Sequence, residues 1–483
     1  MSLRRVLGSG VLALGAALLL GACDDINTVS RPTEPVVLTG AQLPDLLGAD
    51  PGRIVAFRHG IVEGQPVWTQ IPVQVDQRKV VPFGSQPASN DVAGTEGTVY
   101  GSGSGGPAAL QYADPSTFVG ADPDPTFDAD DELVFMVADA GGKPRDDNRT
   151  VPPGVVADSG VAVRVEDPRG ENQRGWVHLF RSTGAFDPGA GQDYVDYDFV
   201  LASGDYRTTY RRAQGPNPEA SRVVTPSYEI DFTDRWKETA WRIRAGWATG
   251  VDILDGHKNQ FAPTTCGRSN QTFADGEGAF VANIDGPVRA IRSYVGANSG
   301  PLTQRTHLLY RDVEHTVTNL RVHQIPSVMD FVDYSDAARG MTYRSSVHPD
   351  GVPIDGAADA ISTARPEWEA VDGPQGRVYT RTWTVTDVPG LDAATVEFYR
   401  DQTTPTEGQC WGDGSYLGAS GMWLQATIPN TDPRATPFAT LTSHRLTQLA
   451  RPAIDPANIP ASAADWAEAA GTPLALTVTP YRP

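Results

Sequence analysis

Along most of the chain, hydrophobic and polar positions alternate with a period of two, in short runs separated by glycine and proline. Such alternation, enriched in β-branched and aromatic residues, is typical of strands with one face on a core. The chain contains 49 Gly and 39 Pro, so turn residues bound these runs throughout. The predicted strands are 53–57, 70–75, 133–138, 161–165, 176–180, 194–201, 241–245, 279–284, 288–295, 307–310, 316–322, 378–385, 395–399 and 474–479.

Helical patterns are sparse. The clearest covers residues 463–471, where Ser462 is a candidate N-cap and Gly471 a candidate stop. No fixed-period repeat is present, which disfavours propellers and solenoids. The pattern therefore predicts a mainly β protein, a large antiparallel β-sandwich or supersandwich with few short helices.

The first 23 residues have the layout of a secretory signal. Arg4 and Arg5 precede an apolar run over 6–20, which is shorter than the roughly 20 residues that a membrane-spanning helix needs. The run ends in Leu20-Gly-Ala-Cys23, which resembles a bacterial lipobox. The resemblance implies cleavage before Cys23 and a diacylglycerol on its sulfur, and an ordinary signal peptide is the alternative.

This N-terminus sets the expected organisation and location. We expect a lipoprotein signal peptide over 1–22, a flexible tether over 23–40 and a single large β domain over 41–483. The expected location is extracytoplasmic, with the chain anchored to a bacterial membrane through its N-terminal lipid.

Charge and cysteine content narrow the possible partners. The formal net charge of −20 argues against nucleic acid or anionic lipid as the main partner, so membrane contact should come through the lipid. With Cys23 lipidated, Cys266 and Cys410 remain as a pair in an oxidising compartment. They predict a disulfide, and two free buried thiols are the alternative.

Three segments occur in an order that resembles a known group of secreted proteins. They contain Ile71-Pro-Val-Gln-Val75, Asp131-Glu-Leu-Val-Phe135 and Gly286-Pro-Val-Arg289. This order resembles the galactose-mutarotase-like supersandwich proteins. The resemblance implies a supersandwich fold. Some members act on polysaccharides as lyases or hydrolases, and others are uncharacterised bacterial proteins.

An acidic stretch over 122–132 is a candidate metal site. Asp128, Asp130, Asp131 and Glu132 offer closely spaced hard oxygen ligands of the kind that calcium prefers, although the spacing is not that of an EF-hand. The simpler interpretation is a solvated acidic loop that leads into a strand.

Two concentrations of histidine and basic residues are candidates for chemistry. His257 and Lys258 follow Asp252 and Asp255, so a carboxylate could orient the imidazole while the ammonium stabilises negative charge. In the second concentration, residues two apart on a strand share a face and could present an arginine–histidine patch to an acidic sugar. A charged turn and a hydrated sheet face are the simpler interpretations. The candidate catalytic residues are His257, Lys258, Arg289, Arg305, His307 and His323.

Tryptophans complete the candidate site. Trp236, Trp241 and Trp247 could stack on sugar rings if they are exposed, with Arg321 as a further substrate-binding residue, and core packing is the alternative. Signatures of serine hydrolases, zinc proteases and nucleotide-binding proteins are missing from the sequence. The leading hypothesis is a lipoprotein that binds or degrades a polysaccharide, as a lyase or glycoside hydrolase if it is an enzyme. The alternative is a non-enzymatic adhesion or envelope-assembly lipoprotein.

Overall fold

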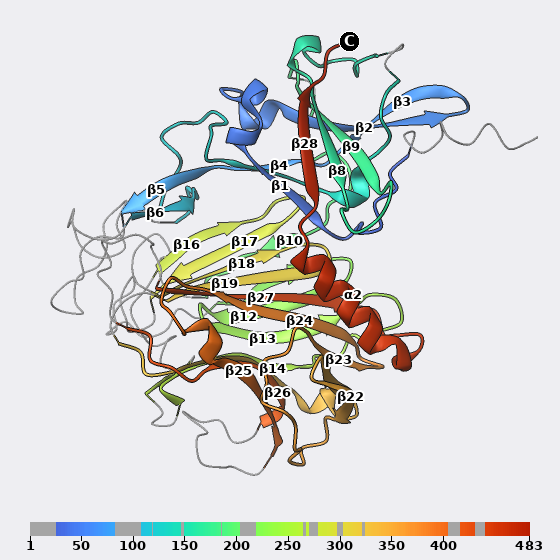
Figure 1. The fold of residues 1–483 in the computed structure, drawn as a ribbon. Helices are drawn as coiled ribbons and strands as arrows, with labels where there is room; N and C mark the ends of the chain where they lie inside the picture. Colours follow the sequence, from blue (N-terminus) through green and yellow to red (C-terminus); the bar gives the residue numbers. More distant parts are fainter. Residues whose placement is uncertain are drawn as a thin grey trace, which may run out of the picture.

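The computed structural model describes residues 26–82, 108–117, 119–145, 149–184, 186–202, 219–263, 267–269, 279–296, 303–320, 324–403, 416–429 and 440–483. In this part the chain is mostly antiparallel β-sheet, as the alternating pattern predicts (Figure 1). The predictions for Cys23, Cys266, Arg321, His323 and Cys410 lie outside the described residues.

Two sheets pack together in the N-terminal part. One has the strand order β28-β8-β9-β2-β3 and the other the order β1-β7-β4. Their strands are β1 (Pro35–Thr39), β2 (Ile54–Val62), β3 (Gln65–Ile71), β4 (Gln74–Asp76), β7 (Glu132–Met136), β8 (Val161–Glu166), β9 (Arg174–Arg181) and β28 (Ala475–Pro480); a separate hairpin consists of β5 (Arg78–Pro82) and β6 (Ala108–Tyr112). Buried aliphatic side chains such as Leu38, Leu133 and Val177 fill the core of this part. Because β28 pairs with β8, the last strand of the chain completes an N-terminal sheet.

A nine-stranded sheet forms the centre of the molecule, with the order β16-β17-β18-β19-β27-β24-β23-β21-β22. Its strands are β16 (Ala279–Ile284), β17 (Ala290–Val295), β18 (Thr303–Leu309), β19 (Val313–Leu320), β21 (Thr342–Ser345), β22 (His348–Pro353), β23 (Glu369–Gly373), β24 (Gly376–Val385) and β27 (Leu441–Ala450). Along β27, buried and half-buried residues alternate strictly, because one face of the strand points into the sandwich.

Two smaller sheets cover the inward face of the nine-stranded sheet, with the orders β10-β11-β12-β13 and β15-β14-β20-β26-β25. Their strands are β10 (Asp196–Asp198), β11 (Ser221–Val224), β12 (Tyr228–Asp234), β13 (Lys237–Ile243), β14 (Leu254–Phe261), β15 (Arg268–Ser269), β20 (Val328–Tyr334), β25 (Thr395–Gln402) and β26 (Tyr416–Leu424). The strand predicted over 194–201 is shorter than expected: β10 pairs over 196–198, and beyond it Leu201 forms an isolated bridge with Glu219.

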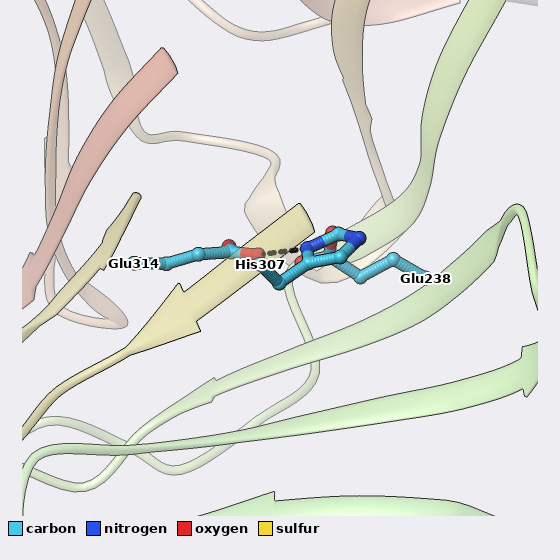
Figure 2. Close-up of side chains that lie close together, drawn as sticks. All are labelled: Glu238, His307 and Glu314. Atoms are coloured by element: carbon cyan, nitrogen blue, oxygen red, sulfur yellow. Dashed lines mark hydrogen bonds and ion pairs between the residues drawn. The ribbon is translucent and has the colours of Figure 1, made fainter. Parts of the chain in front are cut away.

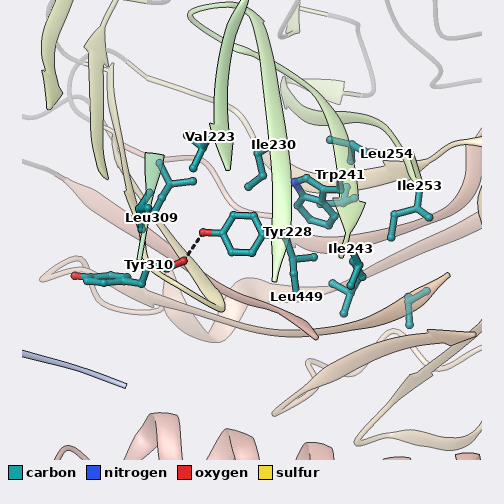
Figure 3. Packing of buried hydrophobic residues seen from close by; sticks show 14 of the residues in the cluster. Val223, Tyr228, Ile230, Trp241, Ile243, Ile253, Leu254, Leu309, Tyr310 and Leu449 are labelled. Carbon is teal, nitrogen blue, oxygen red and sulfur yellow. Dashed lines mark hydrogen bonds between the residues drawn. The ribbon is translucent and has the colours of Figure 1, made fainter. Parts of the chain in front are cut away.

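The largest core cluster lies between these layers (Figure 3). Ile230 and Trp241 from the small sheet meet Leu309 and Leu449 from the nine-stranded sheet. The hydroxyl of Tyr228 donates to a backbone carbonyl 2.6 Å away, so this buried polar group is satisfied. Packing of this kind makes the sandwich interior a closed region. The single domain over 41–483 stays a prediction.

One α-helix, α2 (Ile459–Gly471), is present among the described residues and lies across the outer face of the nine-stranded sheet (Figure 1). It begins at Ile459 rather than after Ser462; the Ser462 hydroxyl donates back to the Ile459 carbonyl, so Ser462 is not the N-cap. Short 3-10 helices cover Gly40–Gln42, Pro44–Leu46, Pro51–Arg53, Val137–Asp139, Ala157–Ser159, Asp336–Ala338, Asp392–Ala394 and Pro456–Asn458. No helix in the described ranges is long and apolar enough to cross a membrane.

The predicted tether over 23–40 is too long at its C-terminal end. Pro35–Thr39 form β1, which pairs with β7 and buries Val36 and Leu38 in the N-terminal core. Burial of these two side chains stabilises the strand. The strand was not predicted because the residues before it are polar and include prolines.

Candidate functional site

The inward face of the nine-stranded sheet is polar at its middle. Arg305 and His307 on β18 lie opposite Thr318 and Thr316 on β19, and Thr316 lies opposite Arg445 on β27. Alternation along each strand places all five side chains on the same face, inside the sandwich. Arg305 and His307 therefore share a face as predicted, but that face is buried.

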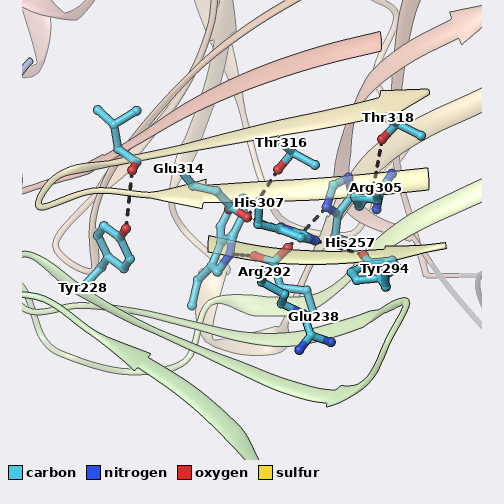
Figure 4. Close-up of polar contacts among 12 residues, drawn as sticks. Tyr228, Glu238, His257, Arg292, Tyr294, Arg305, His307, Glu314, Thr316 and Thr318 are labelled. Atoms are coloured by element: carbon cyan, nitrogen blue, oxygen red, sulfur yellow. Dashed lines mark hydrogen bonds and ion pairs between the residues drawn. The ribbon is translucent and has the colours of Figure 1, made fainter. Parts of the chain in front are cut away.

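His257 is held in this interior by two carboxylates, of which Figure 4 labels Glu238. Its Nε2 donates to Asp330 Oδ1 at 2.6 Å, and its Nδ1 lies 3.3 Å from Glu238 Oε2. The other oxygen of Asp330 accepts from Arg305 Nη2 at 2.9 Å. Burial and the charge of Arg305 act to lower the pKa of His257, but the two carboxylates outweigh them and raise it. The two carboxylates therefore favour the protonated form of His257, which makes it a member of an ion-pair chain.

His307 lies beside this chain and is the uncharged histidine. Its Nδ1 donates to Glu314 Oε1 at 2.6 Å, and its Nε2 accepts the Tyr294 hydroxyl at 2.9 Å. Burial lowers the pKa of His307 well below its usual value. We call the buried set of Glu238, His257, Tyr294, Arg305, His307, Glu314 and Asp330 the interior network.

Glu238, His307 and Glu314 gather closely enough to resemble a metal site (Figure 2). Their ligand atoms all lie within 4.8 Å of one another. However, both nitrogens of His307 already form hydrogen bonds, and Glu238 accepts the indole N–H of Trp241. A metal would have to break these bonds, so the donor set does not fit an ion as it stands.

Charge within the interior is balanced by neighbouring side chains. Asp330 and Glu314 interact electrostatically with Arg305 and Arg445 as well as His257. A cavity beside Asp330 has a volume of about 10 Å³, room for one water and far too small for a sugar ring. The interior network is therefore a closed, largely self-satisfied cluster.

Two further predicted catalytic residues within the described ranges form separate ion pairs. Lys258 lies on the other face of β14, with its Nζ 2.7 Å from Asp333 Oδ2. Arg289 pairs with Asp76 at 2.7 Å and with Glu132 at 2.5 Å, and so links the nine-stranded sheet to the N-terminal part. The predicted set is thus divided among three places, and no single site contains it.

Three of the four predicted calcium ligands gather, and the fourth does not. Carboxylate oxygens of Asp128, Asp130 and Asp131 lie within 4.8 Å of one another. Asp131 accepts from two backbone N–H groups at 2.8 and 3.0 Å, and burial raises its pKa to about 6. Glu132 points away and pairs with Arg78 and Arg289. These bonds order the loop without an ion, and calcium stays a prediction.

The predicted sugar-stacking tryptophans differ in exposure. Trp236 and Trp241 are buried in the core, so neither can meet a ligand ring, and core packing is the correct interpretation. Trp247 is 53% exposed, with the Arg451 guanidinium 5.5 Å from its ring centroid.

An open groove lies on the opposite, outer face of the nine-stranded sheet, between β24 and α2. It has a volume of about 860 Å³. We call it the helix groove; it is lined by Arg365, Pro366, Glu367, Arg381, Thr382, Trp383, Ala461, Ala464, Asp465, Ala467, Glu468, Gly471 and Thr472. Sequence reasoning missed it, although Arg381 and Trp383 stand two residues apart in a predicted strand and therefore share a face.

Stacked planar side chains form one wall of the helix groove. The Trp383 ring is parallel to His444 at 4.7 Å, and the Arg381 guanidinium lies 5.3 Å from the Trp383 centroid. Behind them, His315 Nε2 is 3.2 Å from His444 Nδ1. Burial lowers the pKa of His315 to about 3 and that of His444 to about 4. Both imidazoles are therefore neutral near pH 7, and a single N–H can bridge them.

The charged residues of the helix groove are unequally engaged. Arg365 pairs with Asp392 at 2.7 Å, and Asp465 pairs with Arg169 at 3.1 Å. Arg381 forms no ion pair with any residue in the described ranges, and burial lowers its pKa. The groove therefore offers guanidinium donors and carboxylate acceptors beside an aromatic ring.

Comparisons with known proteins give remote likenesses only. No family model matches the chain, and no curated protein matches it. Two solved structures are similar: the Slr1438 protein from Synechocystis sp. PCC 6803 and a "Putative aldose 1-epimerase" from Escherichia coli K12. For the first, the TM-score is 0.29 and the identity 11%, over 49% of this chain and 97% of the other. For the second, the TM-score is 0.29 and the identity 10%, over 53% of this chain and 100% of the other.

Proposed function

We propose that this chain is an extracytoplasmic, lipid-anchored protein that binds a carbohydrate in the helix groove. The observation that carries the proposal is the groove itself, an open volume of about 860 Å³ with charged side chains around Trp383. Ligand sites usually have volumes of roughly 300–1,000 Å³ and a few convergent polar groups. The anchor is proposed from Arg4, Arg5, the apolar run and Cys23.

The chemistry of the lining favours a sugar over other ligands. Sugar hydroxyls both donate and accept hydrogen bonds, and the groove supplies donors from Arg381 and acceptors from Glu367 and Glu468. Apolar C–H faces of a sugar can pack on the indole of Trp383. Carboxylates in the lining and the net charge of −20 disfavour a nucleic acid.

Binding is favoured over bond cleavage. His257, Arg305 and His307, the residues first considered for catalysis, are buried in the interior network, and their polar atoms bind one another. A group whose hydrogen bonds are already satisfied in a dry interior cannot reach a substrate.

The test is a binding screen of the chain against neutral and acidic polysaccharides, followed by titration of the best ligand. Trp383→Ala should weaken affinity by about tenfold, because a tryptophan in a binding site commonly contributes at least that much. Trp247→Ala is the matched control, since Trp247 is also an accessible tryptophan beside a guanidinium, and it should leave affinity unchanged. If no glycan binds, the adhesion or envelope-assembly hypothesis takes its place.

A further inference from the structure

A hairpin of β2 and β3 projects away from the N-terminal sheets (Figure 1). Its two turn residues, Glu63 and Gly64, have positive φ values of 51° and 77°. Such values are those of a tight two-residue hairpin turn, which continues the twist of both strands. The tip therefore has a defined shape and extends beyond the sandwich core.

Beside the turn, both strands of this hairpin carry exposed apolar side chains. Ile61, Val62 and Val67 are 40%, 58% and 37% exposed, and Ile26, at 60%, lines the same groove of about 320 Å³. We call these four residues the hairpin patch. Val62 and Val67 share one face of the hairpin, and Ile61 lies on the other. Single exposed apolar side chains are common, but several around one groove mark a surface that can meet another apolar phase.

The position of the hairpin patch along the chain identifies that phase. Cys23, the proposed lipid attachment residue, is three residues before Ile26, and three residues span at most about 11 Å. Any bilayer that holds the lipid of Cys23 therefore lies within reach of the patch. Exposed Arg58 lines the same groove and can contact lipid phosphates.

We propose that the hairpin patch rests on the membrane surface and gives the chain a second membrane contact beside its lipid. This inference rests on the proposed lipid anchor. An apolar contact suits a chain with a net charge of −20, because anionic headgroups would repel most of its surface. The second contact limits rotation about the tether and holds the N-terminal part against the membrane.

The experiment measures co-sedimentation with phosphatidylcholine vesicles of the chain from Asp24 onward, which lacks both the apolar run over 6–20 and the lipid-attachment residue. Ile61→Ser/Val62→Ser/Val67→Ser in that background should weaken partitioning by about tenfold, because the apolar side chains supply the affinity. The control, Val80→Ser/Val385→Ser/Ile454→Ser, removes as many exposed apolar side chains from outside the patch and should leave partitioning unchanged.

Three results would overturn the proposal. The chain from Asp24 onward could fail to sediment at any lipid concentration, the two triple variants could lose the same affinity, or the hairpin variant could change the oligomeric state and leave vesicle binding intact. None depends on glycan binding, so failure here is distinguishable from failure of the proposed carbohydrate function. Lipid attachment is read separately, from the mass of the mature wild-type chain.

Discussion

The interior network and the helix groove are built from similar side chains, but only one can meet a ligand. Both combine histidine and arginine with carboxylates and aromatic rings. In the interior network, Asp330 accepts hydrogen bonds from both His257 and Arg305, and the cavity beside it has a volume of only about 10 Å³. In the helix groove, Arg381 has no ion-pair partner among the described residues and faces about 860 Å³. Unused hydrogen-bonding capacity beside open space, and not residue type, distinguishes a binding site from a structural cluster.

The largest expected effect is on stability, from breaking the interior network. Asp330→Asn removes the charge that two buried cations share, so His257 and Arg305 lose their counter-ion in a dry environment. Removing one partner of a buried ion pair typically costs about 3–5 kcal/mol. Urea unfolding should show this loss in the free energy of unfolding.

The control for this prediction is an exposed ion pair near the helix groove. Asp465→Asn removes the partner of Arg169, and the Asp465 side chain is 76% exposed. Exposed pairs contribute about 0–1 kcal/mol, so the loss should be small. If Asp330→Asn keeps wild-type stability but loses glycan affinity, the interior network is functional and the comparison above is wrong.

The second prediction concerns pH and the far end of the sandwich interior. The Tyr343 hydroxyl is hydrogen-bonded to both Glu369 and Glu397. Burial together with the charge of Glu369 raises the pKa of Glu397 to about 8. Between the ordinary glutamate pKa of 4.5 and the raised value of about 8, the folded chain holds a proton that the unfolded chain releases. Stability should therefore fall as pH rises through this window and level off above it.

Glu397→Gln should remove that dependence, because an amide cannot ionise. Urea unfolding between pH 5 and pH 9 should show a decline that is smaller than in the wild type by about 4 kcal/mol. Glu171→Gln, on an exposed turn, should leave the wild-type decline in place. If the stability of the wild type and of Glu171→Gln rises over this pH window instead of falling, the raised pKa of Glu397 is contradicted.

The third prediction concerns affinity in the helix groove. Arg381→Gln should weaken glycan binding by about tenfold, equivalent to about 1.4 kcal/mol, because the unpaired guanidinium is lost. Stability should change little, since Arg381 forms no ion pair with a described residue. Titration of the best glycan measures the first effect, and urea unfolding the second.

Arg381→Lys separates charge from geometry. Lysine keeps the positive charge but loses the planar group that lies over Trp383, so it should not restore affinity. Wild-type affinity in this variant would mean that the groove needs only a cation, and the stacked wall would then have no role in recognition.

Local pattern predicted the sheets well and the sites poorly, for one physical reason. The alternation over 279–284 predicts β16 with the same bounds, because period two is visible within a few residues. The same pattern predicts that Arg305 and His307 share a face. It cannot say that His257 and Asp330, from strands elsewhere in the sequence, cover that face and satisfy its charges.

The helix groove was missed for the same reason. Arg381 and Trp383 belong to a predicted strand, but the opposite wall is α2, more than 70 residues later in the sequence. Which face of β24 is buried depends on packing between distant elements, and the local pattern does not contain that information. The strand β1 was missed because its partner β7 is nearly 100 residues away.

The smallest expected effect is a pH dependence of stability at the helix groove, with a sign opposite to that expected for Glu397. Burial lowers the pKa of His444 to about 4 from 6.5, so the folded chain releases a proton that the unfolded chain holds between these values. Its contribution to stability is therefore complete above pH 6.5 and is lost as pH falls toward 4, the opposite direction to that of Glu397. His444→Gln cannot be protonated in this range and should reduce the decline between pH 6.5 and pH 4.5 by about 1 kcal/mol in urea unfolding.

Glycan affinity of the wild type should stay level from pH 6 to pH 8, because the imidazoles behind Trp383 remain neutral there. A step in affinity near pH 6.5 would show that a histidine of the stacked wall takes up a proton when the groove is filled, and the wall would then be an active part of recognition instead of a rigid support.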